Sequence, residues 1–217
     1  RYDLGLMCFT PQIWTSDNTD ARMRTKIQEG SLYGIPQSVM SAHVSIVPNH
    51  QTGNTTPLES RFNVAAAGIL GYEYDLTKAS EEELACMKKQ IAFYKKHRAL
   101  LQYGQYHLID SVYDNNCDGV TSYIVVSEDK SEAIATVIQH TYEQPIPVKF
   151  HLTGLDDNFL YHISMRQQCN IDYIQDYVVR GDVLNHALDF APLAWERERE
   201  QNSNAIFSRM FYIKKID

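Results

Sequence analysis

The densest group of polar side chains in the sequence lies near its beginning, in residues 14–20. Trp14 is followed within six positions by Asp17 and Asp20, with serine, asparagine and threonine among the residues between them. An indole ring packs on the apolar face of a sugar while carboxylate oxygens accept hydrogen bonds from its hydroxyl groups, so this combination favours a carbohydrate ligand. The alternative is that Asp17 or Asp20 caps the helix that follows, which on spacing alone is the commoner use of such an aspartate.

The neighbouring elements are expected to place this run at the edge of a sheet. The apolar run Leu6–Thr10, which ends at Pro11, predicts a buried strand, and a helical stretch with Met23 and Ile27 follows residues 14–20. Enzymes built on barrels carry their catalytic groups at the C-terminal ends of parallel strands. We therefore expect the polar run to lie at such an edge.

Strands and helices continue to alternate through the first part of the chain. Val39–Val47 predicts a second strand, and a helix is expected to begin with Thr56 as its N-cap and to run as an apolar stripe to Ile69. Another helix should begin at Ser80 and end near Gly104. This alternation is typical of a parallel α/β sheet or barrel.

The number of these units is too small for a whole barrel. An eight-stranded barrel takes about 250 residues. We therefore expect residues 1–104 to be the C-terminal part of a catalytic (β/α)8 TIM barrel.

Residues 105–217 follow a different pattern, of short β-rich runs separated by turn residues such as Arg180-Gly181-Asp182. Because no long helix stands between these runs, they predict a C-terminal antiparallel β-sandwich domain. The fold class is thus α/β plus all-β. The predicted strands are Tyr106–Ile109, Ser122–Ser127, Ala133–Tyr142, Val148–Leu152, Leu160–Ser164, Ile174–Arg180 and Ala205–Ile213.

Composition argues against several classes of function. The 217 residues carry a net charge of −7, so a nucleic-acid partner is not expected. The longest run without a polar residue, Val64–Tyr72, is far shorter than the ~18 residues that cross a bilayer, so no membrane partner is expected either. The four cysteines are widely spaced, which favours free thiols in a cytoplasmic protein, with two disulfides as the alternative. His43 and His50 lack an acidic partner at ligand spacing, so we interpret them as core or loop residues and expect no metal or other cofactor.

Several longer motifs resemble those of the α-galactosidases of glycoside hydrolase family 36. In chain order they are Thr10–Ala21, Ala42–Ser45, Pro48–Gly53, Thr56–Glu59, Gly71–Leu76 and Gln90–Arg98. The resemblance is dense in the first half of the chain and loose in the second. It implies a catalytic (β/α)8 barrel followed by an antiparallel β-sandwich. It also implies retaining hydrolysis of terminal α-linked galactose from oligosaccharides such as melibiose, raffinose and stachyose, without a metal or nicotinamide.

By this resemblance Asp17 is the catalytic general acid/base, and Asp17 and Trp14 bind the substrate. A retaining mechanism also needs a second carboxylate about 5–5.5 Å away as nucleophile. In the family this residue is an aspartate in a Lys-x-Asp motif upstream of the acid/base, whereas the one Lys-x-Asp here is Lys215-Ile216-Asp217. We therefore expect the C-terminal portion of an enzyme, inactive as an isolated chain, whose partner is the rest of the barrel upstream of Arg1.

Two other interpretations stay open. One is a non-catalytic fragment whose sandwich serves assembly or carbohydrate contact. The other is a family member that acts as a galactosyl transferase. Because relatives are often oligomers, the resemblance also implies a homo-oligomer.

Overall fold

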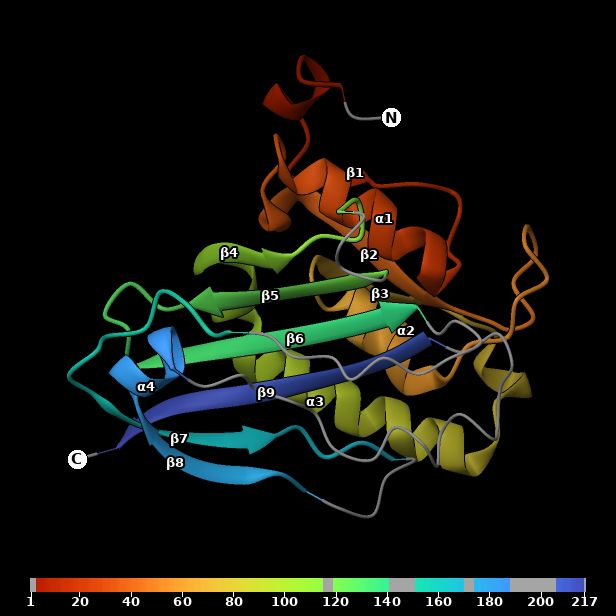
Figure 1. Ribbon diagram of the computed structural model, residues 1–217. Helices are drawn as coiled ribbons and strands as arrows, with labels where there is room; N and C mark the ends of the chain where they lie inside the picture. Colours follow the sequence, from red (N-terminus) through yellow and green to blue (C-terminus); the bar gives the residue numbers. More distant parts are fainter. Residues whose placement is uncertain (1–2, 115–118, 141–150, 170–173, 188–205, 217) are drawn as a thin grey trace. The chain divides into compact units, whose positions relative to one another are not determined.

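The computed structural model describes residues 3–114, 119–140, 151–169, 174–187 and 206–216. The chain separates into two compact units, Arg1–Tyr103 (unit 1) and Gly104–Asp217 (unit 2) (Figure 1). In the part of the chain that is described, no helix is both long and apolar enough to span a membrane.

Unit 1 alternates short strands with helices. Three strands form a parallel sheet in the order β1-β2-β3, and the register places Trp14 beside Ser41 and His43 beside Gly71. Helices connect successive strands, as parallel pairing requires. The elements of unit 1 are η1 (Leu6–Cys8), β1 (Ile13–Trp14), α1 (Ala21–Leu32), η2 (Gln37–Val39), β2 (Met40–Ser45), α2 (Leu58–Ala65), β3 (Ile69–Glu73), η3 (Leu76–Lys78) and α3 (Glu81–Tyr103).

The strand predicted over Leu6–Thr10 is wrong. Its first residues form the 3-10 turn η1, and the strand β1 comes after Pro11. The turn is closed locally, because the backbone N–H of Leu6 donates to the Asp3 carboxylate at 3.0 Å and that of Thr10 to the Leu6 carbonyl at 3.1 Å. Phe9 is 87% exposed, so the apolar run that suggested a buried strand is at the surface of unit 1.

The helix starts follow the sequence only in part. Ser80 forms the expected cap of α3, since the Glu83 N–H donates to Ser80 Oγ at 3.2 Å and the Ser80 N–H donates to Glu83 Oε2 at 3.1 Å. The predicted N-cap Thr56 is wrong. Helix α2 begins at Leu58 with Pro57 in the cap position and no side-chain cap.

Strand β3 was missed because its first residue, Ile69, continues the apolar stripe of α2. The helix ends at Ala65, and Gly68 leads into the strand. A Cβ atom at Gly68 would lie 2.5 Å from the carbonyl oxygen of Met40, so this position needs a glycine for β3 to approach β2.

The two faces of the sheet in unit 1 differ. On one face Met40, Ala42 and Val44 of β2 are fully buried. The alternate residues point to the other face, where His43 of β2 is half-buried and Glu73 of β3 is exposed. This second face is the one that carries Trp14.

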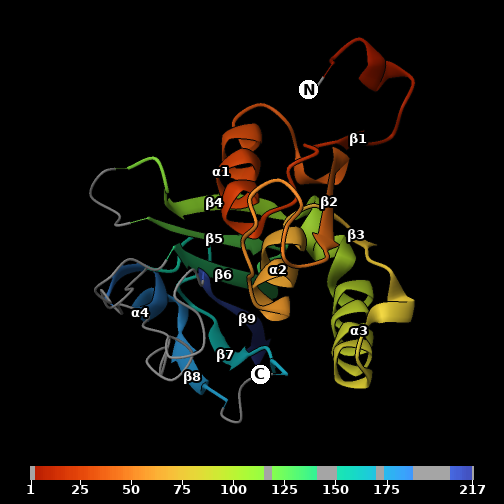
Figure 2. The ribbon, with the colours of Figure 1, turned by 90° about the vertical axis from the view of Figure 1, so that its right-hand side faces the viewer.

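Unit 2 is built on a six-stranded sheet in which every neighbouring pair is antiparallel. Figure 2 shows the strands in the order β4-β5-β6-β9-β7-β8. The last strand in the sequence therefore lies in the middle of the sheet, between β6 and β7. The elements are β4 (Gln105–Asp110), β5 (Val120–Val126), β6 (Glu132–His140), β7 (Leu160–Met165), β8 (Asp176–Arg180), α4 (Gly181–His186) and β9 (Ile206–Ile216).

Six of the seven predicted strands correspond to strands of this sheet. The exception is Val148–Leu152, of which residues 148–150 lie outside the described residues and His151 and Leu152 are not in a strand. The end of the strand predicted over Ala133–Tyr142 also lies outside them. The antiparallel sheet is thus confirmed, whereas the second layer of a sandwich stays a prediction.

The core of unit 2 joins one face of the sheet to the segment around Leu155 and to Leu184 of α4, both fully buried. Burying large aliphatic and aromatic side chains in this way supplies most of the stabilisation of a small domain. The core residues are Val120, Ile124, Val126, Ala133, Ala135, Val137, Leu152, Leu155, Tyr161, Ile163, Met165, Leu184, Phe211 and Ile213.

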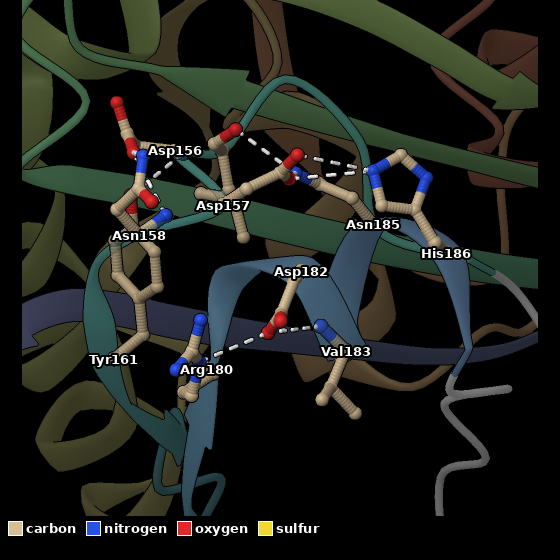
Figure 3. A network of polar contacts seen from close by, with 10 residues as sticks. Asp156, Asp157, Asn158, Tyr161, Arg180, Asp182, Val183, Asn185 and His186 are labelled. Carbon is tan, nitrogen blue, oxygen red and sulfur yellow. Dashed lines mark hydrogen bonds and ion pairs between the residues drawn. The ribbon is translucent and has the colours of Figure 1, made fainter.

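A polar network at the edge of this core fixes α4 (Figure 3). Asp157 accepts a hydrogen bond from Asn185 Nδ2 at 2.7 Å, and His186 lies 3.3 Å from the same carboxylate, so the pKa of Asp157 is lowered. A Cβ atom at Gly181 would lie 1.8 Å from the Asp156 carbonyl oxygen. The turn predicted at Arg180-Gly181-Asp182 is wrong. Arg180 is the last residue of β8 and Gly181 the first of α4, where its backbone packs closely against that of Asp156.

Replacing Ile163 tests this core. Ile163→Ala should lower the free energy of unfolding by about 2–5 kcal/mol, because Ile163 is fully buried and its removal leaves a cavity. Val178→Ala on the neighbouring strand β8 is the control, since Val178 is 56% exposed and the change should stay within about 0.5 kcal/mol. Urea unfolding of both variants measures the difference, and equal losses would contradict the assignment.

Candidate active site at the C-terminal edge of the parallel sheet

The loop after β1 brings Trp14 and Asp17 together. The indole Nε1–H of Trp14 donates a hydrogen bond to Asp17 Oδ1 at 2.9 Å. The Asp17 side chain is exposed, and its Oδ2 atom has no hydrogen-bond partner among the described residues. Gln51, from the loop after β2, donates through Nε2 to the backbone carbonyl of Asp17 at 3.4 Å. One carboxylate oxygen is thus held by the indole while the other faces solvent.

Asp20 has a different role from Asp17, because it caps α1. Its Oδ1 accepts hydrogen bonds from the backbone N–H groups of Arg22 at 2.7 Å and Met23 at 3.4 Å. Its Oδ2 accepts from Asn54 Nδ2 at 2.6 Å and from the hydroxyl of Thr52. The capping role that the spacing allowed for either aspartate therefore belongs to Asp20, which is buried.

The loop after β2 is shaped around Asn49. Its amide nitrogen donates to Thr19 Oγ1 at 3.2 Å, and its Oδ1 accepts from the backbone N–H groups of Gln51 at 3.0 Å and Thr52 at 3.1 Å. Gly53 closes the turn with a φ of 71°, a conformation that side chains disfavour. This loop holds Gln51 beside the backbone of Asp17.

A buried arginine holds the loop after β1 in place through hydrogen bonds. Arg24 of α1 is 1% exposed, and its guanidinium donates to the carbonyls of Ser16 at 3.0 Å and Ser41 at 2.9 Å and to the side chain of Gln28 at 3.1 Å. Thr15 Oγ1 donates to the same Ser41 carbonyl at 2.7 Å. These bonds tie the start of the loop to α1 and to β2.

His43 lies directly beside the indole of Trp14. The two ring centroids are 4.1 Å apart with an interplanar angle of 64°, an edge-on arrangement. Burial lowers the pKa of His43, the Arg24 guanidinium acts in the same direction, and the Glu73 carboxylate acts against both. The His43 ring is therefore neutral near pH 7.

The loop after β3 is anchored by a second arginine. Arg61 of α2 donates to the carbonyls of Thr56 at 3.1 Å and of Ser45, and its guanidinium lies 5.9 Å from the centre of the Tyr74 ring. The Tyr74 hydroxyl donates to Glu83 Oε1 at 2.8 Å. Burial raises the pKa of Tyr74 and lowers that of Arg61.

A buried cluster between α2 and α3 contains Glu59, Cys86 and Gln90. The Cys86 thiol donates to one oxygen of Glu59 at 3.3 Å, and Gln90 Nε2 donates to the other at 3.0 Å. Gln90 in turn accepts from the Tyr72 hydroxyl at 2.9 Å. Among the described residues of unit 1, no three histidine, cysteine or acidic side chains of that unit lie close enough together to ligate one metal ion.

The sequence indicated Trp14 and Asp17, but the residues that hold them were missed. His50 is exposed in the loop after β2, in line with its interpretation as a loop residue, whereas His43 stands on the same sheet face as Trp14. The strand register explains this contact. Trp14 pairs with Ser41, and His43 lies two residues further along β2 on the same face.

The comparisons with known proteins agree with the two-unit organisation of the chain. A family model described as Melibiase matches residues 1–104, and the model of the glycosyl hydrolase family 36 C-terminal domain matches residues 120–206. The chain belongs to glycoside hydrolase family 36. Among its relatives, α-galactosidase AgaA from Geobacillus stearothermophilus is 44% identical over 76% of this family 36 chain. α-Galactosidase Mel36A from Lactobacillus acidophilus is 41% identical over 89% of it. The chain spans 22% and 25% of the length of these two relatives.

Solved structures of family 36 α-galactosidases resemble the chain over nearly its whole length. The enzyme from Lactobacillus brevis has a TM-score of 0.84 and 41% identity, covering 99% of this chain and 28% of its own. A variant of AgaA from Geobacillus stearothermophilus in complex with raffinose has a TM-score of 0.81 and 36% identity, covering 98% and 27%. Another AgaA variant was solved in complex with stachyose.

Substituting the two aspartates separates the roles that the geometry gives them. Asp20→Ala should lower the free energy of unfolding of the family 36 chain by about 2 kcal/mol or more, because it removes the cap of α1 and leaves Asn54 and Thr52 without their acceptor. Asp17→Ala is the matched control and should change stability by less than about 0.5 kcal/mol, since Asp17 is exposed. Denaturant unfolding of both variants provides the measurement, and the reverse order would refute the assignment.

The lowered pKa of His43 makes stability depend on pH. The unfolded chain, with a histidine pKa near 6.5, takes up a proton at higher pH than the folded chain. The free energy of unfolding therefore falls as the pH drops from about 6.5 to the lowered pKa of the folded state. Phenylalanine at position 43 does not titrate. The free energy of unfolding of His43→Phe, relative to that of the unsubstituted chain, should therefore rise when the pH is lowered from about 8 to about 5.5. An identical stability difference at both pH values would contradict this prediction.

Proposed function

We propose that the chain carries the general acid/base, Asp17, of a retaining α-galactosidase. The observation that carries this proposal is the state of the Asp17 carboxylate, which is exposed, bonded through Oδ1 to the indole of Trp14 and without a partner on Oδ2 among the described residues. Asp20, the other aspartate of the loop, is buried and has donors on both oxygens. Membership of family 36 supports the same conclusion.

In the first step of such a reaction Asp17 donates its proton to the glycosidic oxygen as the bond to the anomeric carbon breaks. A nucleophilic carboxylate forms a covalent galactosyl intermediate at the same time. In the second step the Asp17 carboxylate takes a proton from water, whose oxygen attacks the anomeric carbon and releases the nucleophile. Asp17 is then protonated again, and the product keeps the α configuration.

We infer that Oδ2 of Asp17 is the atom that exchanges the proton. Oδ1 accepts the Trp14 N–H at 2.9 Å, which leaves Oδ2 to face the leaving group. Trp14 would contact the substrate beside the carboxylate. These two residues are the proposed substrate contacts of this chain.

The proposed substrates are oligosaccharides with a terminal α-linked galactose. Structures of AgaA variants in complex with raffinose and with stachyose support this substrate class. We propose further that the three-stranded parallel sheet of unit 1 is part of a (β/α)8 barrel, whose other strands supply the nucleophile. We place that nucleophile outside this chain, because its one Lys-x-Asp motif ends at Asp217, in the wrong order and context.

Asp17→Asn in the whole protein that contains this chain is the central test. The rate of raffinose hydrolysis should fall by about 10² to 10⁴-fold, because an amide cannot protonate the leaving oxygen. Hydrolysis of a nitrophenyl α-galactoside should fall less in the galactosylation step, since nitrophenolate leaves without a proton. Added azide should restore turnover of the nitrophenyl substrate and give α-galactosyl azide, because azide attacks the intermediate without base catalysis.

Asp182→Asn in unit 2 is the matched control, since the partly exposed Asp182 side chain bonds, among the described residues, only to Arg180 and Val183, its neighbours in the sequence. It should leave both activities unchanged. Unimpaired raffinose hydrolysis by Asp17→Asn would refute the proposed role. Turnover by the isolated 217-residue chain would show that the nucleophile lies within it.

A further inference from the structure

The His43 ring is confined between residues of the two neighbouring strands. On the β1 side it meets the indole of Trp14 at 4.1 Å between centroids. On the β3 side its register partner is Gly71. A Cβ atom at Gly71 would lie 2.5 Å from His43 Cδ2 and 2.6 Å from Nε2, so the ring occupies the space where a side chain of β3 would stand. The His43 ring thus contacts Trp14 on one side and fills the space that Gly71, which has no side chain, leaves on the other.

The position of the His43 ring fixes the direction of the Trp14 N–H. The indole is planar and rotates about two bonds only, so contacts on its ring determine where Nε1 points. His43 contacts the ring edge-on, the Arg24 guanidinium lies 5.7 Å from its centre, and Nε1 donates to Asp17 Oδ1. Arg24 is itself held by the Ser16 and Ser41 carbonyls. His43 is therefore the one contact of the indole in this set that a single substitution can remove without breaking the loop.

We propose that His43 is a positioning residue for the acid/base, acting through Trp14, with Gly71 providing the space for its ring. In this arrangement His43 sets the indole so that Nε1–H holds Oδ1 of Asp17 and Oδ2 faces the leaving group. The inference rests on the proposed role of Asp17 and deepens it. In this proposal His43 acts through Trp14 alone and is assigned no contact with substrate or reacting atoms.

The chemistry of the cluster suits this role. Burial lowers the pKa of His43, so Trp14 packs against a neutral aromatic ring near pH 7. The charged groups that act on His43 are Glu73 of β3 and Arg24 of α1, which oppose each other. A slightly larger aromatic ring without nitrogen atoms, that of phenylalanine, would therefore preserve the contact, whereas a small side chain would not.

The test compares variants of the whole protein on two substrates with different leaving groups. His43→Ala should lower kcat/KM for raffinose by about 10-fold or more, because a displaced carboxyl transfers its proton poorly. It should lower kcat/KM for a nitrophenyl α-galactoside by less than about 3-fold, because that leaving group needs little acid catalysis. His43→Phe should restore raffinose hydrolysis to within about 3-fold of the unsubstituted protein.

Gly71→Ala tests the same contact from the other strand. The added methyl group overlaps the His43 ring, which must move toward Trp14, so the same selective loss on raffinose is expected. Gly34→Ala is the matched control, because a Cβ atom there meets no atom within 4 Å. Thermal unfolding of each variant separates lost activity from lost folding, and the His43→Phe and His43→Ala pair decides the question if Gly71→Ala does not fold.

The losses should also depend on Asp17. In an Asp17→Asn background, His43→Ala should cause no further loss on raffinose, since both substitutions remove the same proton transfer. Equal losses on the two substrates, failure of phenylalanine to restore activity, or full additivity with Asp17→Asn would each overturn the inference. If Asp17→Asn alone leaves raffinose hydrolysis intact, the proposed function fails instead, and the two results are distinguishable.

Discussion

The carboxylate of Asp20 is the interaction on which the arrangement of the site depends. It receives four hydrogen bonds, two from the backbone at the start of α1 and two from Thr52 and Asn54 in the loop after β2. Hydrogen bonds to a charged, buried acceptor are stronger than neutral ones, and leaving any donor unpaired is costly. Because Asp17 stands three residues before Asp20 in the same loop, fixing Asp20 also restricts where Asp17 can lie.

The parallel sheet then distributes the remaining positioning over three strands. Trp14 comes from β1, His43 from β2 and Gly71 from β3, and they stand side by side because parallel strands keep their register across the sheet. Arg24 of α1 joins the loop after β1 to β2 through the Ser16 and Ser41 carbonyls. No single loop therefore determines the direction of the indole N–H. It depends on how β1, β2 and β3 pack side by side within unit 1.

Local patterns in the sequence predicted what depends on local forces. The cap of α3 by Ser80 and most strands of unit 2 follow from capping chemistry and short apolar runs. Leu6–Thr10 was mistaken for a strand because the sequence does not reveal that Phe9 is exposed. Strand β3 was not predicted because the need for glycine at position 68 comes from its close approach to the Met40 carbonyl, which is distant in the sequence. His43 was undervalued for the same reason, since its contact with Trp14 depends on register between strands.

The two aspartates of one loop illustrate how environment assigns chemistry to identical side chains. A carboxylate whose oxygens all have fixed donors cannot take and release a proton without breaking those bonds, so Asp20 serves structure. A proton-transfer group needs one oxygen held for direction and one that meets the substrate, which is the state of Asp17. The partners that create this difference come from different parts of the chain: Thr52 and Asn54 from the loop after β2, and Trp14 from β1. The division of roles is therefore a property of the folded unit, and spacing within residues 14–20 alone cannot encode it.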